Sequence, residues 1–416
     1  MRNDSKISNK VKEQIERFSK NISKDMFKPQ KKFIAQVIYG IQASRDIKLS
    51  NISRSLNEEI KLIKVENRLS KHMGKKDMTE GMNKKLIEEG SKRIGNETVL
   101  AIDLSDINKP YAKKMENLTK VWNGSEGKVG DGYWICEVIG AQVKGEEITP
   151  MYSELYSQDA KEFKSENEQV LKAVEEVNKG VKGRGIWTID RGGDRIKIIE
   201  KLNEMKVQFV IRINFRRNIT DKNEKERNVL EYAKGIRCRE KFTITIDEEG
   251  YEKKIEIKLG MGKKIKVGGI ELNLAVIKGF GKEPMLLLTT LEKSAKEILE
   301  IYLTRWKCEE SFRFLKQEYH LEDVRVRSYV GLRNTVVLLQ SVFYFISVYI
   351  GKRLKMNILL KKILEKANRF FQVPVFKQYA IADGIYRILF NTKWDDDKKT
   401  DEMDDRQGVF EFMLET

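Results

Sequence analysis

In the first ninety residues, hydrophobic positions recur at the spacing of an amphipathic helix. The pattern predicts four helices, at residues 10–26, 32–44, 49–56 and 58–72. Ser50 is the expected N-cap of the third helix. Short helices joined by tight polar turns are typical of helix-turn-helix DNA readers and equally of a plain helical bundle, so both interpretations stay open. Residues 73–96, rich in Lys, Glu and Gly, are predicted to be a linker.

From residue 97 the pattern changes to short apolar segments bounded by polar residues, which are typical of strands. The predicted strands cover residues 98–102, 132–143, 148–156, 185–189 and 208–213, with helices at 162–179 and 195–205. The strands look antiparallel at first and then alternate with helices. This order predicts an α/β sheet with helices on its faces.

Residues 216–290 alternate between polar and apolar residues with period two. The alternating segments are 242–246, 254–259, 264–267, 272–277 and 285–288. We expect a meander of short strands that forms an insertion rather than a continuation of the sheet. After it, helices are predicted at 302–316, 336–350 and 354–371. The polar segment 391–407 is expected to be a loose tail.

The apolar run Val336 to Ile350 is shorter than a membrane-spanning helix and contains Gln340 and Ser341, so we expect a buried core helix. The polar N-terminus is not a signal peptide. The expectation is therefore a soluble, cytoplasmic protein with no membrane partner.

Charge and composition add one hint about the partner. Among 416 residues, 80 Lys and Arg face 63 Asp and Glu, which gives a formal charge of +17. Such an excess attracts polyanions, of which nucleic acid is the commonest. Abundant Lys, Ile and Asn also fit an AT-rich genome, so the charge favours nucleic acid only modestly.

Metal-binding residue types are scarce apart from carboxylates. The three cysteines, Cys136, Cys238 and Cys308, show no paired spacing that would predict a disulfide or a zinc site. Only His72 and His320 are present, which nearly excludes His-based metal sites and a Ser-His-Asp set. A catalytic metal would have to be held by carboxylates, and oxygen ligands favour Mg²⁺ or Mn²⁺.

The segment 302–316 has no Gly or Pro and is predicted to be one continuous helix. On such a helix Tyr302, Arg305, Glu309 and Lys316 fall within an arc of about 60°. A carboxylate between two cations suggests a site for a metal ion and a phosphate. Taken alone, the same residues also fit a surface salt bridge.

Two aspartates directly follow predicted strands, where an open α/β sheet places its functional groups. Asp103 follows the strand at 98–102, and Asp190 follows the strand at 185–189. Each alone is weakly informative, because strands often end in an Asp that starts a turn. Asp106 and Asp194 lie close by in the sequence and compete for the same roles.

These residues resemble the DD(E) transposases of bacterial insertion sequences. Tyr302, Arg305, Glu309 and Lys316 match the subgroup signature Tyr-x2-Arg-x3-Glu-x6-Lys without a gap. Segments 102–106 and 187–194 resemble those around the family's first and second aspartates, and 209–212 resembles the strand after the second. The resemblance runs from about residue 33 to 338.

The resemblance implies a ribonuclease H-like fold with a β-rich insertion and a helical N-terminal domain. The expected ranges are a DNA-binding domain at 1–92, a catalytic core at 93–214 and 291–350, the insertion at 215–290, and a C-terminal helical region with an acidic tail at 351–416. The expected activity is cleavage of the ends of a mobile DNA element and strand transfer into target DNA. A catalytically silent descendant, such as a repressor, is the alternative.

By this resemblance, Asp103, Asp190 and Glu309 are the catalytic residues and hold Mg²⁺ or Mn²⁺, two ions per active site. Tyr302, Arg305 and Lys316 are expected to contact DNA. The implied partners are double-stranded DNA, as terminal inverted repeats and target, and a second copy of the chain in a synaptic homodimer. The implied location is the bacterial nucleoid.

Some relatives flip a base onto a Trp of the insertion, and this insertion contains no Trp. Its aromatic residues Tyr232, Phe242, Tyr251 or Phe280 would have to serve instead. Formation of a DNA hairpin therefore stays open.

Overall fold

The computed structural model describes residues 2–124, 127–248, 251–350, 354–367, 376–390 and 392–394. The chain divides into two compact units. The first comprises Met1–Lys85, Ile107–Leu118 and Arg313–Thr416, and the second comprises Leu86–Asp106 and Thr119–Phe312. Each unit thus combines segments that are far apart in the sequence.

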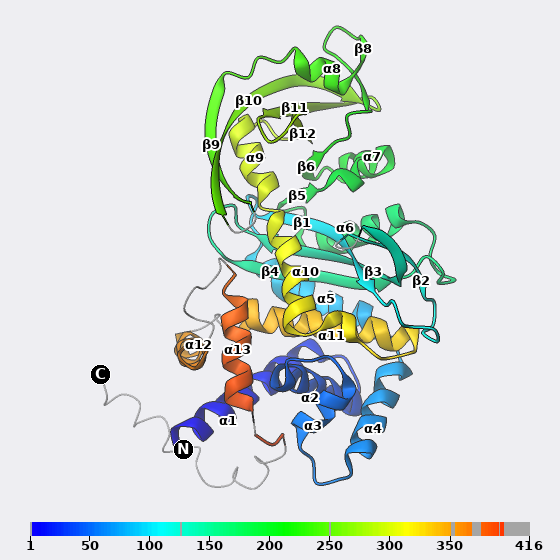
Figure 1. Cartoon of the computed structure of the whole chain (residues 1–416), viewed down its shortest axis with the longest axis vertical. Coiled ribbons are helices and arrows are strands. Elements are labelled where there is room, and N and C mark those ends of the chain that lie inside the picture. The colour runs from blue at the N-terminus through cyan, green and yellow to red at the C-terminus, as the bar shows by residue number, and fades with distance from the viewer. Residues whose placement is uncertain are drawn as a thin grey trace, which may run out of the picture. The chain divides into compact units, whose positions relative to one another are not determined.

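The first unit is helical (Figure 1). Its N-terminal helices are α1 (Arg2–Ile22), α2 (Lys28–Ser44), α3 (Leu49–Leu56) and α4 (Leu62–Lys75). Its C-terminal helices are α11 (Tyr329–Tyr344), the π-helical turn η4 (Phe345–Tyr349), α12 (Leu354–Lys366) and α13 (Gln378–Leu389), with the short turn η3 (Leu321–Asp323) before them. Helix α2 packs against α1, α3, α11 and α13. The four predicted N-terminal helices are confirmed, with shifted ends.

Two local predictions in this region are wrong. The N-cap of α3 is Lys48, and Ser50 lies inside the helix. The side chain of Asp46 binds the N-cap residue instead, because its Oδ1 accepts from the Lys48 backbone N–H at 2.7 Å. The predicted linker is in fact helical, as α5 (Thr79–Gly90) and η1 (Ser91–Arg93). Met82 and Leu86, four residues apart, are buried on one side of α5, an apolar pair that the charged residues around it obscure.

The predicted core helix is confirmed as buried. Residues Tyr329–Tyr349 are long and apolar enough to cross a membrane by length and composition, and no other described helix is. However, 83% of that window is buried inside the protein. This burial agrees with the helix being part of the protein core.

The second unit is built on a mixed sheet in the order β2-β3-β1-β5-β6-β12-β11-β10-β7-β8, with β4 beside β3 and β9 beside β10. The strands are β1 (Val99–Asn108), β2 (Thr119–Asn123), β3 (Lys128–Ala141), β4 (Ile148–Tyr156), β5 (Ile186–Ile189), β6 (Gln208–Arg212), β7 (Asn218–Thr220), β8 (Glu226–Asn228), β9 (Glu240–Glu248), β10 (Tyr251–Val267), β11 (Ile270–Lys278) and β12 (Met285–Thr289). Strand β5 is parallel to both β1 and β6. The prediction of an α/β sheet is confirmed, although β2, β7 and β8 were not predicted.

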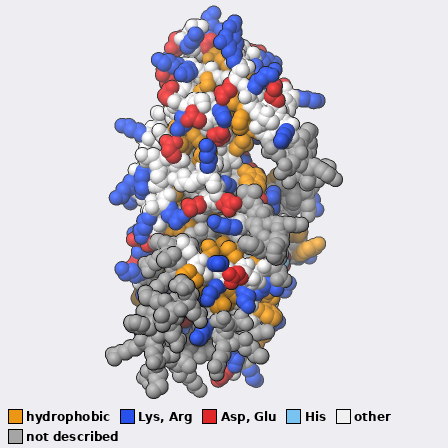
Figure 2. All heavy atoms as spheres, turned by 90° about the vertical axis from the view of Figure 1, so that its left-hand side faces the viewer, with side chains coloured by type: hydrophobic (Ala, Val, Ile, Leu, Met, Phe, Trp, Pro, Cys, Tyr) orange, Lys and Arg blue, Asp and Glu red, His pale blue; other side chains and the backbone are white. Residues whose placement is uncertain are grey.

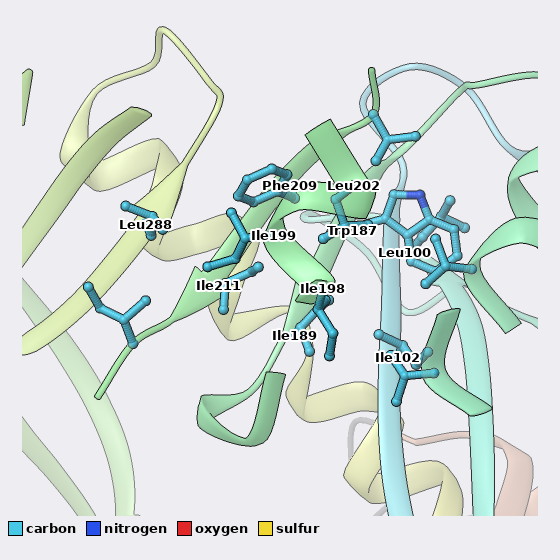
Figure 3. Close-up of a cluster of buried hydrophobic side chains, with 14 of the residues drawn as sticks. Leu100, Ile102, Trp187, Ile189, Ile198, Ile199, Leu202, Phe209, Ile211 and Leu288 are labelled. Atoms are coloured by element: carbon cyan, nitrogen blue, oxygen red, sulfur yellow. The ribbon is translucent and has the colours of Figure 1, made fainter. Parts of the chain in front are cut away.

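Helices cover the sheet in this unit. They are α6 (Glu166–Val181), α7 (Ile196–Glu204), α8 (Val229–Lys234) and α9 (Ala295–Leu303). Ile198, Ile199 and Leu202 of α7 pack against a buried cluster drawn from the strands (Figure 3). The labelled members of the cluster on the strands are Leu100, Ile102, Trp187, Ile189, Phe209, Ile211 and Leu288. This packing fixes the parts of β1 and β5 that precede Asp103 and Asp190.

The expectation that residues 216–290 form an insertion apart from the sheet is wrong. Strand β12 pairs with β6, with Leu288 opposite Ile211, and all five residues of β12 are buried. The meander therefore extends the core sheet through β12, β11 and β10. Period-two alternation indicates that a strand has one apolar and one polar face, but it does not indicate which strand pairs with it. Segments 254–259 and 264–267 are one strand, β10, with a register shift between Gly262 and Ile265.

Candidate active site

Asp103 and Asp190 lie on neighbouring parallel strands of the second unit. Strand β1 continues to Asn108, so the prediction that it ends at Asp103 is wrong. Its pairing with β5 nevertheless ends at Ala101 and Thr188, and Asp103 lies two residues beyond that pair. Asp190 directly follows β5. Since the two strands are parallel, both acids lie toward the same, carboxyl edge of the sheet.

The local backbone fixes the position of Asp190. Its side chain caps the turn η2 (Arg191–Gly193) by accepting from the Gly192 backbone N–H at 2.8 Å. Both Asp190 and Asp103 line one cavity of about 100 Å³. The cavity is also lined by Glu166 and Arg195, which are paired with each other.

Asp194, the sequence competitor of Asp190, has other partners. Its carboxylate forms an ion pair with Arg217 and accepts from the backbone N–H of Asn214 at 2.7 Å. The Asp194 backbone carbonyl also accepts from Arg217, at 3.0 Å. This set of bonds ties the turn after Asp190 to the segment that follows β6. The arrangement favours Asp190 over Asp194 as the acid that is free to act.

The signature residues do not lie on one helix, so that prediction is wrong. Helix α9 ends at Leu303, and α10 (Trp306–Glu318) begins after a turn at Thr304 and Arg305. Hydrogen bonds of the tighter i to i−3 type connect the two, from Arg305 N to the Tyr302 carbonyl at 3.0 Å and from Cys308 N to the Arg305 carbonyl at 2.8 Å. The Thr304 hydroxyl donates to the Glu300 carbonyl at 2.9 Å, and such back-bonding bends helices.

Arg305, in this turn, bridges two of the three candidate acids. Its Nη1 donates to Asp103 Oδ2 at 2.8 Å, and its Nη2 is ion-paired with Glu309 Oε1. The side chains of Arg305 and Asp103 are 13% and 15% exposed, whereas that of Glu309 is 47% exposed. A largely buried pair of this kind is held more firmly than a surface salt bridge.

The electrostatics of Asp103 show that the three acids lie near one another. Burial raises the pKa of Asp103 to about 6, against the opposing effect of Arg305, and the charges of Asp190 and Glu309 raise it further. Burial alone would lower the pKa of Arg305, but the nearby Asp103, Tyr302 and Glu309 outweigh it and raise the pKa. The structure therefore brings Asp103, Asp190, Arg305 and Glu309 into one site.

Tyr302 and Lys316 are placed differently from these four residues. Tyr302 is 5% exposed, and its ring centre lies 5.9 Å from the Arg305 guanidinium carbon. Burial raises the pKa of Tyr302, so its hydroxyl stays protonated. Lys316 belongs to the first unit, where its Nζ lies 3.1 Å from Glu322 Oε1. Contact of either residue with DNA stays a prediction.

Comparison with known proteins bears on this site. Residues 153–344 match the family model described as the transposase DDE domain. The matched region is less than half of the chain, and it is similar to the transposase DDE domain. The matched region includes Asp190, Arg305 and Glu309, whereas Asp103 lies before it.

Other comparisons add little. A solved structure described as the cryo-EM structure of piggyBac transposase synaptic complex with hairpin DNA is 14% identical, with a TM-score of 0.40 over 75% of this chain. This chain spans about three-fifths of that chain, 61% of its length. A likeness of this size carries no argument about the fold or the partner. No curated protein matches the chain.

DDE transposases generally use divalent metal ions, and the donor chemistry of the site fits them. Asp103, Asp190 and Glu309 supply only carboxylate oxygens, which suit Mg²⁺ or Mn²⁺. Their present positions are a different matter. Among the described residues, no three His, Cys, Asp or Glu form a group that could hold a metal ion. Arg305 lies between Asp103 and Glu309, so a cation could reach both only after Arg305 moves.

Two cations near the candidate site were missed by sequence reasoning. Arg212 ends β6, the parallel neighbour of β5, and its charge affects the pKa of Tyr302. Arg191 directly follows Asp190, and its guanidinium carbon lies 5.3 Å from the centre of the Phe215 ring. A possible signal was present in the sequence, since both residues occupy the ends of adjacent predicted strands, as the candidate acids do.

Proposed function

We propose that this protein is a DD(E) transposase of a bacterial insertion sequence, of the subgroup with the Tyr-x2-Arg-x3-Glu-x6-Lys signature. It cleaves the ends of a mobile DNA element and transfers the strands into target DNA. The observation that carries the proposal is the convergence of Asp103, Asp190 and Glu309 around Arg305. We further propose that β4-β3-β1-β5-β6 forms a ribonuclease H-like core.

Asp103, Asp190 and Glu309 would hold Mg²⁺ or Mn²⁺, two ions per active site. When bound, the ions supply an activated water or 3′-hydroxyl and stabilise the leaving oxygen during hydrolysis and transesterification. The chain's own contribution is positional. The Gly192 N–H fixes the Asp190 carboxylate, and burial limits the motion of Asp103. These restraints keep two acids in place before DNA arrives.

Arg305 has a second proposed task, at the scissile phosphate. A phosphodiester gathers negative charge in its transition state, and a guanidinium offers it two donors at once. In the structure Nη1 and Nη2 of Arg305 donate to Asp103 and Glu309. Arg305 would be released toward DNA if metal ions were bound by Asp103 and Glu309 in its place. Tyr302 and Lys316 are proposed to contact DNA near the cleaved end.

The proposed partner is double-stranded DNA, as the terminal repeats of the element and as target, bound by a homodimer in the synaptic complex. The proposed location is the bacterial cytoplasm, on the nucleoid. The positive charge of the chain supports a polyanionic partner.

The decisive experiment uses labelled duplexes taken from the DNA that flanks the coding region. We expect nicking at the element ends with Mg²⁺ or Mn²⁺ and none with EDTA. Asp103→Ala, Asp190→Ala and Glu309→Ala should each abolish nicking and spare DNA binding. Glu175→Ala is the matched control, since Glu175 is a solvent-exposed acid on α6. Full activity in one triad variant would remove that residue from the proposal, and Asp106 would be tested next. Binding without nicking by the unaltered protein would favour the silent DNA-binding alternative.

A further inference from the structure

Helix α4 presents two opposite faces of different chemistry. At 100° per residue, one face carries the buried Val65, Leu69 and Met73, which pack toward the helices of the first unit. The opposite face is solvent-exposed. Its residues are Ile63, Lys64, Asn67, Lys71 and Lys75.

The lysines of this exposed face lack acidic partners. Among the described residues, no carboxylate forms an ion pair with Lys64, Lys71 or Lys75. Arg68, at the side of the same helix, is by contrast bound to Glu58 at 2.6 Å. On the face that Figure 2 shows, Lys and Arg are interspersed with Asp and Glu. The exposed face of α4 thus gathers, along one side of one helix, three lysines without an acidic partner in the described part of the chain.

The surroundings hold α4 rigidly at its C-terminal end. Asn334 of α11 donates to the carbonyls of Met73 and Lys76 at 2.7 and 2.8 Å and accepts from the Met78 N–H at 2.7 Å. Arg333 of α11 adds an ion pair with Asp77 at 2.9 Å. A helix fixed in this way loses little further backbone entropy when its outer face binds a partner.

The N-terminal end of the exposed face is apolar. Ile63 is 59% exposed, and Ile60 and Leu62 beside it are exposed as well. Exposed apolar side chains next to unpaired lysines suit a surface that contacts both base edges and phosphates. Thymine methyl groups provide apolar contacts in the major groove, and Asn can bond bidentately to adenine.

We propose that the exposed face of α4 enters the major groove of duplex DNA, with Ile63 and Asn67 on base edges and Lys64, Lys71 and Lys75 on phosphates. A helix of 10 to 12 Å diameter matches a groove about 12 Å wide. An A-form RNA duplex, whose major groove is deep and narrow, does not admit it. The inference rests on the proposed function in one respect, because that function supplies the duplex as partner.

The first test measures phosphate contacts by salt dependence. The probe is a fluorescent 30-base-pair duplex of mixed sequence, titrated with full-length protein from 50 to 200 mM salt. The triple variant Lys64→Gln, Lys71→Gln, Lys75→Gln should flatten the slope of log K against log salt by roughly 2 to 3, at about 0.9 per phosphate contact. The control, Lys6→Gln, Lys20→Gln, Lys24→Gln, loses the same charge from exposed positions of α1 and the turn after it and should keep the slope.

The second test measures sequence reading, with a randomised duplex pool from which the protein selects its sites. Asn67→Ala and Ile63→Ala should each relax the preference at one or two positions, by roughly tenfold or more for Asn67, and leave the salt slope unchanged. Circular dichroism and melting temperature check that every variant is folded.

The outcomes separate this inference from the proposed function. If the α4 triple variant keeps both the slope and the selected sequence, α4 is not the reading helix, and the nicking experiment on the carboxylates is unaffected. If the α4 variants lose DNA binding while the unaltered protein binds duplex but never nicks it, the inference stands and the transposase proposal fails. If the unaltered protein shows no binding to duplex DNA, both fail.

Discussion

At the scale of single residues, Arg305 combines two roles that sequence reasoning kept apart. The signature predicts a cation that contacts DNA, whereas the structure places the same guanidinium between Asp103 and Glu309. A guanidinium and a divalent cation are electrostatic competitors for the same carboxylate oxygens. Spacing along the chain could suggest the contact with Glu309, four residues away. It could not reveal the contact with Asp103, which lies 202 residues away.

The competition predicts how Arg305→Ala behaves. In the absence of divalent metal, the variant should be less stable by about 3 kcal/mol, since it leaves a largely buried carboxylate without its partner. Mn²⁺ should restore stability in the variant more than in the unaltered protein, because the cation no longer has to displace Arg305. Thermal melting across a Mn²⁺ series measures both effects.

Arg305→Lys is the matched control, as it keeps the charge but offers no planar fork to span two acids. The stabilisation of Arg305→Lys by Mn²⁺ should lie between that of the unaltered protein and that of Arg305→Ala. Equal stabilisation of all three proteins by Mn²⁺ would show that Arg305 does not compete with the cation.

His72 on α4 gives a prediction about pH. Burial, followed by the charges of Lys75, Arg68 and Lys71, lowers the pKa of His72, and its ring stacks on Phe33 with centroids 5.6 Å apart. The unfolded state therefore binds the proton more readily than the folded state. The stability that the neutral His72 ring contributes is present above the ordinary His pKa near 6.5. It is lost as the pH falls through the lower pKa that His72 has in the folded protein.

The measurement is the melting temperature at pH 7.5 and 5.5 for the unaltered protein and His72→Gln. The unaltered protein should lose more stability on acidification than the variant does. The matched control is His320→Gln, in the same unit. An identical pH response in the unaltered protein and His72→Gln would mean that protonation of His72 does not destabilise the folded state.

At the scale of elements, periodicity predicted most strands and helices, because each has one buried face. It failed where a local hydrogen bond overrides propensity. The segment 302–316 contains no Gly or Pro, yet the Thr304 hydroxyl and i to i−3 bonds bend it at the residue that bridges the acids. Likewise, sequence could not choose between Asp190 and Asp194, because Arg217, the partner of Asp194, lies 23 residues away.

The bonds of Asp194 predict how the element that carries Asp190 is held. Asp194 and Arg217 connect the turn η2 to the segment after β6, and their side chains are 3% and 16% exposed. Asp194→Ala should therefore lower the free energy of unfolding by about 3 to 5 kcal/mol, as expected when one partner of a buried pair is removed. Urea denaturation measures this.

The matched control is Glu175→Ala, which breaks a surface pair with Lys201 and should cost less than about 1 kcal/mol. Double substitution, Asp194→Ala with Arg217→Ala, should cost less than the sum of the single changes if the two act as a pair. Additive losses would contradict the proposed tie.

At the scale of the whole molecule, the fold class was predictable and the connections between distant segments were not. Alternation predicted the strands of residues 216–290, but the pairing of β12 with β6 depends on register and burial that no local pattern encodes. The grouping of N-terminal with C-terminal helices in one unit likewise depends on contacts between distant segments that no local pattern encodes. The domain ranges expected from the sequence stay a prediction.

This grouping leads to a prediction about truncation. Phe18 of α1 contacts the C-terminal part of the first unit, with ring centroids 6.0 Å from Tyr344, 5.5 Å from Phe345 and 5.1 Å from Tyr349. Deletion of residues 1–85 would expose these rings and the rest of the apolar surface that α1–α4 cover. Each large side chain so exposed costs about 1.5 to 3 kcal/mol, against a typical total stability of 5 to 15 kcal/mol.

We therefore expect the truncated protein to bind a hydrophobic dye and to lose helical signal beyond the share of the deleted residues, as measured by fluorescence and far-ultraviolet circular dichroism.

Phe18→Ala in the full chain is the milder companion. It should cost about 3 to 5 kcal/mol and increase hydrogen exchange in α11 and η4. Ile63→Ala is the matched control, because that side chain is exposed on α4 and should leave exchange in α11 unchanged. A truncated protein that stays soluble, dye-negative and fully helical would mean that the N-terminal helices fold as a separate domain. In that case, deleting residues 1–85 would be enough to test whether they bind DNA. Because Phe18 packs against the C-terminal part of the same unit, we expect instead that DNA binding has to be tested by point substitutions on the surface of the intact protein.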